Sequence, residues 1–221
     1  MVQFMADFTQ RRVTMVDTQV RPSDVTHFPV LEAMLNVPRE VYAPDAARAT
    51  AYADGPMDLG GGRQLLDPRG TAKLLQALSP TPGDLVLELG AATGYTTALL
   101  AHMAEAVVAI EEDEDLARDA EVALSEQGVD NAALIQGALT EGSVKHGPFD
   151  AIAIPGGVEE IPAAILDQLK EGGRIAAIFM DGPLGEARVG VKSGGRISWR
   201  MAFNATAPVL PGFARAPSFA F

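Results

Sequence analysis

The chain contains no cysteine among its 221 residues. Disulfides, thiolate metal sites and cysteine nucleophiles are therefore excluded. Histidine is also scarce, because only His27, His102 and His146 occur and their spacing matches no metal-ligand pattern. No apolar run approaches the roughly 20 residues that cross a bilayer, and the first residues lack the apolar core of a signal peptide. We therefore expect no bound metal, and we expect a cytoplasmic location.

Positive charge is in short supply. The sequence has 17 Lys and Arg residues against 29 Asp and Glu residues, which gives a formal net charge of −12 at pH 7. Such a surface repels phosphate backbones and anionic membranes. We expect neither nucleic acid nor a membrane as a partner, and the sequence does not indicate an oligomeric state.

The first 82 residues mix helical patterns with proline and glycine. Apolar residues between Val30 and Leu35 fall on one helical face, and Pro38 ends that helix. A loop with the consecutive glycines Gly60–Gly62 follows, and Thr71–Leu78 has the pattern of a short helix. We expect residues 1–82 to form a helical and loop extension that contributes to the site of the acceptor substrate, and residues 83–221 to form the main domain.

From residue 84 onward, short apolar runs alternate with helical patterns. Buried apolar strands that alternate with helices predict an α/β fold with a mostly parallel sheet. The segment 187–203 instead predicts an antiparallel hairpin with a Ser-Gly-Gly turn. The proline-rich tail predicts no regular structure, although Phe213, Phe219 and Phe221 could fold back onto the sheet. The expected strands are 84–89, 106–111, 132–136, 149–154 and 172–180, and the expected helices are 95–104, 113–127 and 161–169.

The stretch LVLELGAATGYTTALLA, residues 85–101, ends a strand in glycines and opens directly into a helix. This arrangement binds an anionic or polar ligand at the helix N-terminus. A dinucleotide fingerprint would need glycine at positions 90, 92 and 95, but Ala92 and Tyr95 stand at the last two. Glycine spacing therefore disfavours a nicotinamide cofactor. The ELGAATG pattern resembles motif I of S-adenosylmethionine-dependent methyltransferases, and Ala92 is tolerated there if its φ is negative.

Glu111 ends the second strand of this region, and Glu112 follows it. An acid at this position can accept hydrogen bonds from both ribose hydroxyls of a nucleoside. The alternative is that these acids only begin a solvated helix, where the macrodipole favours negative charge.

Three N-terminal segments carry a family resemblance: residues 15–20 (MVDTQV), 30–44 (VLEAMLNVPREVYAP) and 51–68 (AYADGPMDLGGGRQLLDP). With ELGAATGY and the following strands, they resemble protein-L-isoaspartate (D-aspartate) O-methyltransferases over roughly residues 15–180. The resemblance implies a Rossmann-like methyltransferase fold, S-adenosyl-L-methionine as cofactor, S-adenosyl-L-homocysteine as product and isoaspartyl proteins as substrate for repair. It implies cofactor contacts at Gln64, Leu65, Glu88, Gly90, Ala91, Ala92, Gly94, Tyr95, Glu111, Glu112, Ala138 and Leu139.

Two positions depart from the family pattern. Leu66 replaces the serine of the acceptor loop, and Ala138 replaces an aspartate near the adenine. Because a carboxylate acceptor is already ionised, the reaction needs an anion-positioning group rather than a general base, and Arg63 or Arg69 could supply it beside Asp67. The replaced serine leaves two alternatives open: the same cofactor with another acceptor, or a non-catalytic member that binds a nucleoside or a protein partner.

Overall fold

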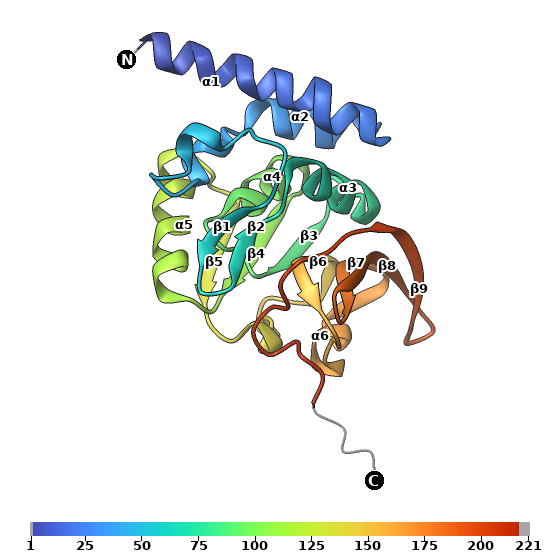
Figure 1. Ribbon diagram of the computed structural model, residues 1–221. Coiled ribbons are helices and arrows are strands. Elements are labelled where there is room, and N and C mark those ends of the chain that lie inside the picture. Colours follow the sequence, from blue (N-terminus) through green and yellow to red (C-terminus); the bar gives the residue numbers. More distant parts are fainter. Residues whose placement is uncertain (1, 217–221) are drawn as a thin grey trace.

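The computed structural model describes residues 2–216, with side chains from residue 7 onward. A seven-stranded sheet with the order β5-β4-β3-β6-β7-β8-β9 forms the centre, and β1 and β2 form a separate two-stranded hairpin (Figure 1). The strands from β5 to β7 are parallel, and β8 and β9 are antiparallel to their neighbours. The strands are β1 (Met57–Gly60), β2 (Arg63–Leu65), β3 (Leu85–Leu89), β4 (Ala106–Glu111), β5 (Ala132–Gln136), β6 (Phe149–Val158), β7 (Leu169–Asp181), β8 (Leu184–Ser193) and β9 (Arg196–Asn204).

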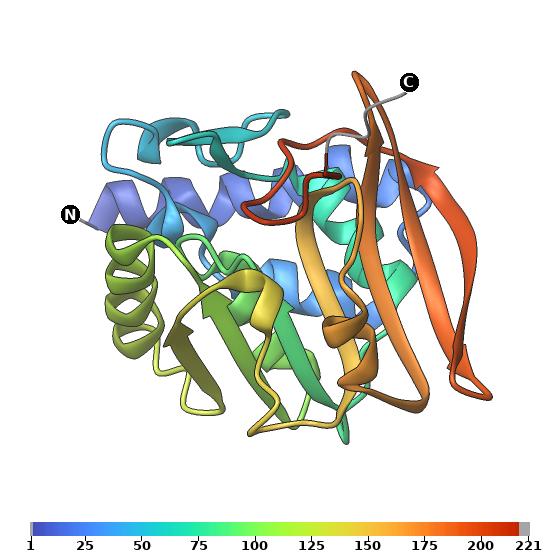
Figure 2. The ribbon, with the colours of Figure 1, turned by 90° about the horizontal axis from the view of Figure 1, so that it is seen from below.

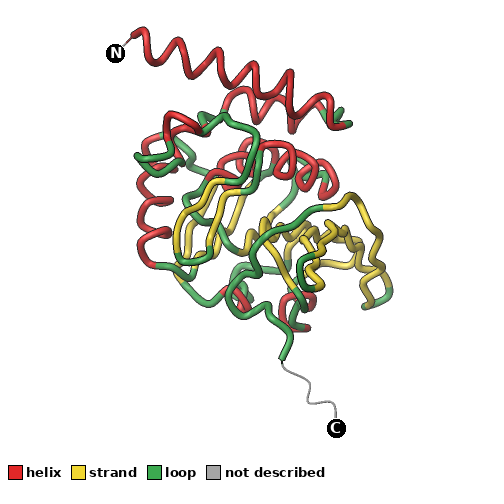
Figure 3. Tube along the Cα trace, viewed as in Figure 1, coloured by secondary structure: helices red, strands yellow, loops and turns green. Residues whose placement is uncertain are grey.

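The two N-terminal α-helices lie together along one side of the molecule, as the tube in Figure 3 shows. No described helix is long and apolar enough to cross a membrane. The α-helices are α1 (Val2–Met15), α2 (Phe28–Asn36), α3 (Pro68–Leu78), α4 (Tyr95–Met103), α5 (Glu114–Glu126) and α6 (Ala163–Asp167), and a π-helical turn (Val16–Val20) extends α1.

The two faces of the sheet are covered differently. Side chains alternate along each strand, so that Val86 joins one core and Leu87 the other. The first core includes apolar residues of α2, α3 and α4. The second core is closed by the short helix α6 and by the C-terminal segment through Leu210 and Phe213. The predicted parallel sheet and the β8–β9 hairpin are confirmed, but one face is covered largely by irregular chain.

The prediction of a loop around Gly60–Gly62 was wrong, because this segment contains the β1–β2 hairpin. Met57 pairs with Leu65, and both side chains are buried. The three glycines all have positive φ, a backbone region that glycine enters without steric cost. They reverse the chain, and the strands are too short for an alternating pattern to reveal them.

The C-terminal segment folds back onto the molecule, as expected for Phe213. That side chain is fully buried, whereas Phe219 and Phe221 lie outside the described residues. Gly157 at the end of β6 donates a hydrogen bond from its N to the carbonyl of Pro208 (2.9 Å) and accepts one from the N of Leu210 (2.8 Å). These bonds fix the segment across the carboxyl ends of the central strands.

Candidate active site

The glycine-containing turn follows β3, at the point where the chain switches from one half of the sheet to the other. β3 lies between β4 and β6, and such switch points are where open α/β sheets bind ligands. Gly90 and Gly94 have φ of +92° and +91°. A Cβ on Gly94 would lie 3.3 Å from side-chain atoms of Ala120 and Leu124 on α5. Conformation and close packing therefore both require glycine at 94, and α4 starts at the next residue.

Alanine at position 92 of the turn was expected to be tolerated if its φ is negative, and Ala92 does not meet this condition. Its φ is +53°, a left-handed conformation that costs an L-residue roughly 1–2 kcal/mol. The strain has a compensation, because the Ala92 N donates a hydrogen bond to Oε2 of Glu111 (2.7 Å). The middle position of the turn therefore keeps the backbone of a glycine although it carries a methyl group.

Glu111 lies at the end of β4, as predicted, and is fully buried. Its partner is Arg63 of the β1–β2 hairpin, which donates two parallel hydrogen bonds of 2.5 and 2.7 Å to the two carboxylate oxygens. The side chain of Arg63 is only 6% exposed. Paired donation of this kind is the strongest arrangement open to an arginine and a carboxylate.

Arg63 therefore does not serve as the free anion-binding group that the sequence suggested. Its guanidinium lies against the glycine turn, because a Cβ built on Gly90 would be 3.4 Å from its Nη2. The same imagined Cβ would be 3.0 Å from Cδ1 of Leu210. Two side chains from distant segments thus cover the turn in the described conformation.

Glu88, the first residue of motif I, is also fully buried. Its Oε2 accepts a hydrogen bond from Thr97 Oγ1 (2.5 Å), while its Oε1 has no partner. Burial raises the pKa of the Glu88 carboxyl to about 8, the Thr97 hydrogen bond opposes the rise, and the nearby Glu111 carboxylate adds to it. The side chain is therefore largely protonated at neutral pH.

Tyr95 begins α4 and is buried, but it packs toward the N-terminal extension. The Arg39 guanidinium lies 4.8 Å from its ring centroid, and the Tyr42 ring lies 5.8 Å away. Arg39 is itself buried and donates to the carbonyls of Ala51 (2.9 Å) and Leu66 (2.8 Å). The burial of Arg39 was not predicted, although this residue stands in the Val-Pro-Arg-Glu segment that carried the family resemblance.

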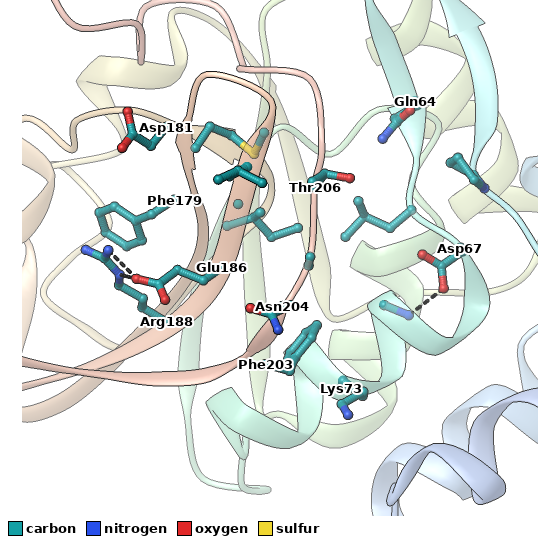
Figure 4. A pocket seen from close by; sticks show the side chains of 18 of the residues that line it. Gln64, Asp67, Lys73, Phe179, Asp181, Glu186, Arg188, Phe203, Asn204 and Thr206 are labelled. Atoms are coloured by element: carbon teal, nitrogen blue, oxygen red, sulfur yellow. Dashed lines mark hydrogen bonds and ion pairs between the residues drawn. The ribbon is translucent and has the colours of Figure 1, made fainter.

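A cavity of about 980 Å³ opens beside the loop that follows β2 (Figure 4). We call it the acceptor cavity, because the residues predicted for the acceptor loop, Leu66, Asp67 and Arg69, line it. Gln64, Asp67 and Lys73 line one side, and Phe179 and the strands β8 and β9 line the other. The remaining lining residues are Pro56, Leu66, Arg69, Gly70, Glu159, Ile178, Met180, Asp181, Leu184, Gly185, Glu186, Arg188, Phe203, Asn204, Ala205, Thr206 and Arg215.

Cationic side chains of α3 reach this cavity from its first and second turns. Arg69 has a side chain that is 52% exposed, and its Nε forms a long ion pair with Oδ1 of Asp67, at 3.8 Å. Lys73 follows four residues later, 5.2 Å from the ring centroid of Phe203. Asp67 is otherwise engaged as the helix cap, because it accepts a hydrogen bond from Gly70 N (2.7 Å). Leu66 presents only apolar atoms, so Arg69 is the predicted acceptor-side residue that keeps a free cationic end.

The other predicted residues lie on both sides of the site. Gln64 lines the acceptor cavity and Leu65 is buried. Ala138 and Leu139 follow β5 at the end beside Glu111, because Gly137 N bonds the carbonyl of Glu111 (3.0 Å). Leu139 is fully buried and Glu112 is exposed. Among residues 2–216 there is no group of three or more His, Asp or Glu side chains that could hold a metal.

A parallel sheet with this turn at its switch point and a buried acid at the next strand end defines an α/β methyltransferase fold. A solved protein-L-isoaspartate O-methyltransferase aligns with a TM-score of 0.81 over 91% of this chain and 66% of that chain, at 22% identity. A Plasmodium falciparum structure from the same family, in complex with S-adenosyl-L-homocysteine, aligns with a TM-score of 0.75 over 92% of this chain and 97% of that chain, at 21% identity.

Sequence comparison identifies the family. The model of protein-L-isoaspartate(D-aspartate) O-methyltransferases matches residues 11–186. The protein-L-isoaspartate O-methyltransferase of Syntrophus aciditrophicus is 38% identical over 77% of this chain and 78% of its own length. The protein-L-isoaspartate O-methyltransferase 2 of Anaeromyxobacter is 39% identical over 82% of this chain and 73% of its own length. The chain belongs to the protein-L-isoaspartate(D-aspartate) O-methyltransferase family.

Proposed function

We propose that this protein is an S-adenosylmethionine-dependent methyltransferase that esterifies the free carboxylate of isoaspartyl residues in damaged proteins. The observation that carries the proposal is the glycine turn at the switch point beside the buried Glu111, in a chain of this family. The proposed compartment is the cytoplasm, where the substrates would be the cell's own ageing proteins.

The residues around the turn fit the nucleoside part of the cofactor. Glu111 presents a carboxylate at the strand end where a ribose is held in related folds, and the turn leaves backbone N–H groups at the start of α4. When bound, the cofactor supplies an electrophilic methyl group on a sulfonium. Arg63 and Leu210 cover Gly90 in the described conformation, so these two side chains have to move for the cofactor to enter.

The acceptor side needs to position an anion rather than to remove a proton. An isoaspartyl carboxylate is ionised at neutral pH, and orientation alone can supply roughly 7–11 kcal/mol of a barrier. We assign this positioning to Arg69, because it lies in the acceptor cavity, its side chain is 52% exposed, and its ion pair with Asp67 is long, at 3.8 Å. The extension within residues 1–82 thereby contributes its share of the acceptor site.

A transfer assay tests the proposed function. Radiolabelled methyl from S-adenosylmethionine should appear on a peptide with one isoaspartyl residue and not on the same peptide with a normal aspartyl residue. Base-labile label on the isoaspartyl peptide alone supports carboxyl methylation. Label on neither peptide, under conditions in which a characterised family member is active, would contradict the assignment.

The role of Arg69 can be tested separately. Arg69→Ala should raise KM for the isoaspartyl peptide by about 10- to 100-fold, because a hydrogen bond to a charged group contributes roughly 1.5–3 kcal/mol. Its affinity for S-adenosylhomocysteine should not change. Arg118→Ala, on the exposed surface of α5, is the matched control. An unchanged KM in Arg69→Ala would show that another group holds the acceptor.

A further inference from the structure

The Glu111 carboxylate is saturated with hydrogen bonds. Oε1 accepts from Arg63 Nη1 and from the backbone N of Glu112 and Asp113. Oε2 accepts from Arg63 Nη2 and from Ala92 N. The three backbone donors are local to the site, because two belong to the residues directly after β4 and the third belongs to the glycine turn. Only Arg63 comes from a distant segment, 48 residues away in sequence.

The space over the glycine turn is filled by the same guanidinium and by Leu210. A Cβ on Gly156 would lie 2.6 Å from Leu210 Cγ, so this leucine is wedged between the ends of β3 and β6. The acceptor cavity does not include Gly90 or Glu111 in its lining, nor does a second cavity of about 1040 Å³ between α5 and the N-terminal extension. In the described conformation, Arg63 and Leu210 therefore lie where a ligand on the glycine turn would approach Gly90.

Arg63 and a ribose would use the same acceptors on Glu111. Two ribose hydroxyls in this fold class donate to the two oxygens of an acid at this strand end. Arg63 donates one nitrogen to each of these oxygens. A carboxylate that already accepts three backbone hydrogen bonds has no room for both partners. Binding of the ribose thus requires Arg63 to leave.

The hairpin that carries Arg63 is tied to the seven-stranded sheet less directly by backbone hydrogen bonds than Leu210 is. In the described chain, β1 and β2 pair with each other and not with the seven-stranded sheet, and Figure 2 shows the hairpin beyond the carboxyl ends of the sheet strands. Apart from the glycine itself and its two chain neighbours, no heavy atom lies within 4 Å of a Cβ built on any of Gly60, Gly61 and Gly62. Leu210, in contrast, is tied to β6 through Gly157.

We propose that Arg63 is a latch: its paired hydrogen bonds to Glu111 hold the β1–β2 hairpin over the cofactor position, and cofactor binds only to the fraction of molecules in which this pair is broken. The inference rests on the proposed function, because it takes a nucleoside cofactor as the competing ligand. The apparent dissociation constant then equals the intrinsic constant divided by the open fraction. Arg63 thereby sets the affinity for cofactor although it is not a catalytic residue.

Titration calorimetry with S-adenosylhomocysteine tests the latch without any turnover. Arg63→Ala removes the guanidinium and should lower the dissociation constant by about tenfold or more, because the closed state loses its main contact. Arg69→Ala, six residues along the chain and free of Glu111, should bind as the wild type does. A folded Arg63→Ala protein, as judged by circular dichroism, that binds no tighter than wild type overturns the proposal.

A second variant covers the case in which Arg63→Ala fails to fold around an unpaired Glu111. Arg63→Gln is neutral and keeps one amide donor within the same region, so it should tighten binding by about threefold or more. Affinity equal to or weaker than that of wild type in this variant also overturns the latch.

Failure of the latch and failure of the proposed function give different results. If wild type binds S-adenosylhomocysteine as tightly as the Arg63 variants and methylates the isoaspartyl peptide, the latch is wrong and the function stands. If the Arg63 variants bind S-adenosylhomocysteine more tightly than wild type, but neither they nor the wild type methylate the isoaspartyl peptide, the latch stands and the acceptor assignment is wrong.

Discussion

The two halves of the candidate site are built in opposite ways. Around Gly90 and Glu111, the polar groups are buried and paired within the chain. The acceptor cavity is open, has about 980 Å³ of space, and is lined by charged side chains such as Arg69 that keep much of their surface in solvent. The half that contains the ELGAATG motif is thus closed, and the half formed by the acceptor cavity is open.

Under the proposed function, the two halves would have different tasks. A closed, low-dielectric pocket strengthens each polar contact, so a nucleoside that enters it is held by few groups with high specificity. An open cavity with several charges of both signs can admit a flexible peptide whose sequence varies around the damaged residue. A repair enzyme needs both properties, one fixed cofactor and many acceptors.

The largest effect is expected on the closed half. Phe213→Ala should lower the free energy of unfolding by about 3–5 kcal/mol, because this fully buried ring anchors the C-terminal segment beside Gly157. Urea denaturation measures the loss. Phe203→Ala is the matched change on the open half, where the ring is half-buried, and it should cost about 1–2 kcal/mol.

Equal losses of unfolding free energy in Phe213→Ala and Phe203→Ala would contradict the contrast between a closed half and an open half. They would mean that the C-terminal segment contributes no more to stability than an exposed strand does, and that Leu210 is not held firmly over the turn.

Much of the closed half could be predicted from sequence because its signals are local. The run from Leu85 to Ala101 contains strand, turn and helix in order, and Glu111 follows at the end of the next apolar run. The conformation of Ala92 could not be predicted in this way, since its positive φ depends on a hydrogen bond to a carboxylate 19 residues away.

The contacts that close the site are long-range and have no sequence pattern. Arg63 was expected at the acceptor because it flanks Leu66. Its actual partner, Glu111, lies 48 residues further along the chain, so the residues around Arg63 do not indicate this contact. The β1–β2 hairpin has strands of four and three residues, too short for a period of two to be counted. Arg69 lines the acceptor cavity from the first turn of α3, a helix that starts at a local proline and aspartate signal, and its role at the acceptor stays a prediction.

A medium effect is expected from the buried acid of motif I. Because its folded pKa is raised to about 8, Glu88 favours the native state fully below its ordinary pKa of 4.5, and this contribution is lost as the pH rises to about 8. Glu88→Gln stays neutral and can still accept from Thr97, so its stability advantage over wild type should grow from pH 5 to pH 8. The measurement is the unfolding free energy of both proteins by urea denaturation at each pH. A difference between variant and wild type that stays constant from pH 5 to pH 8 would show that the native Glu88 is already ionised.

The smallest effect concerns the strained turn itself. Ala92→Gly relieves roughly 1–2 kcal/mol of left-handed strain but loses about 0.8 kcal/mol of methyl burial and roughly 0.4–1 kcal/mol of unfolded-state restriction. The net change in unfolding free energy should therefore lie within about 1 kcal/mol of zero. Ala91→Gly is the matched control, because Ala91 is equally buried and its φ is not positive, so this variant has no strain to relieve and should lose about 1–2 kcal/mol. The difference between the two variants, measured by urea denaturation, isolates the strain at Ala92. Equal losses would mean that the turn relaxes around the methyl group and that the family's middle glycine is dispensable here.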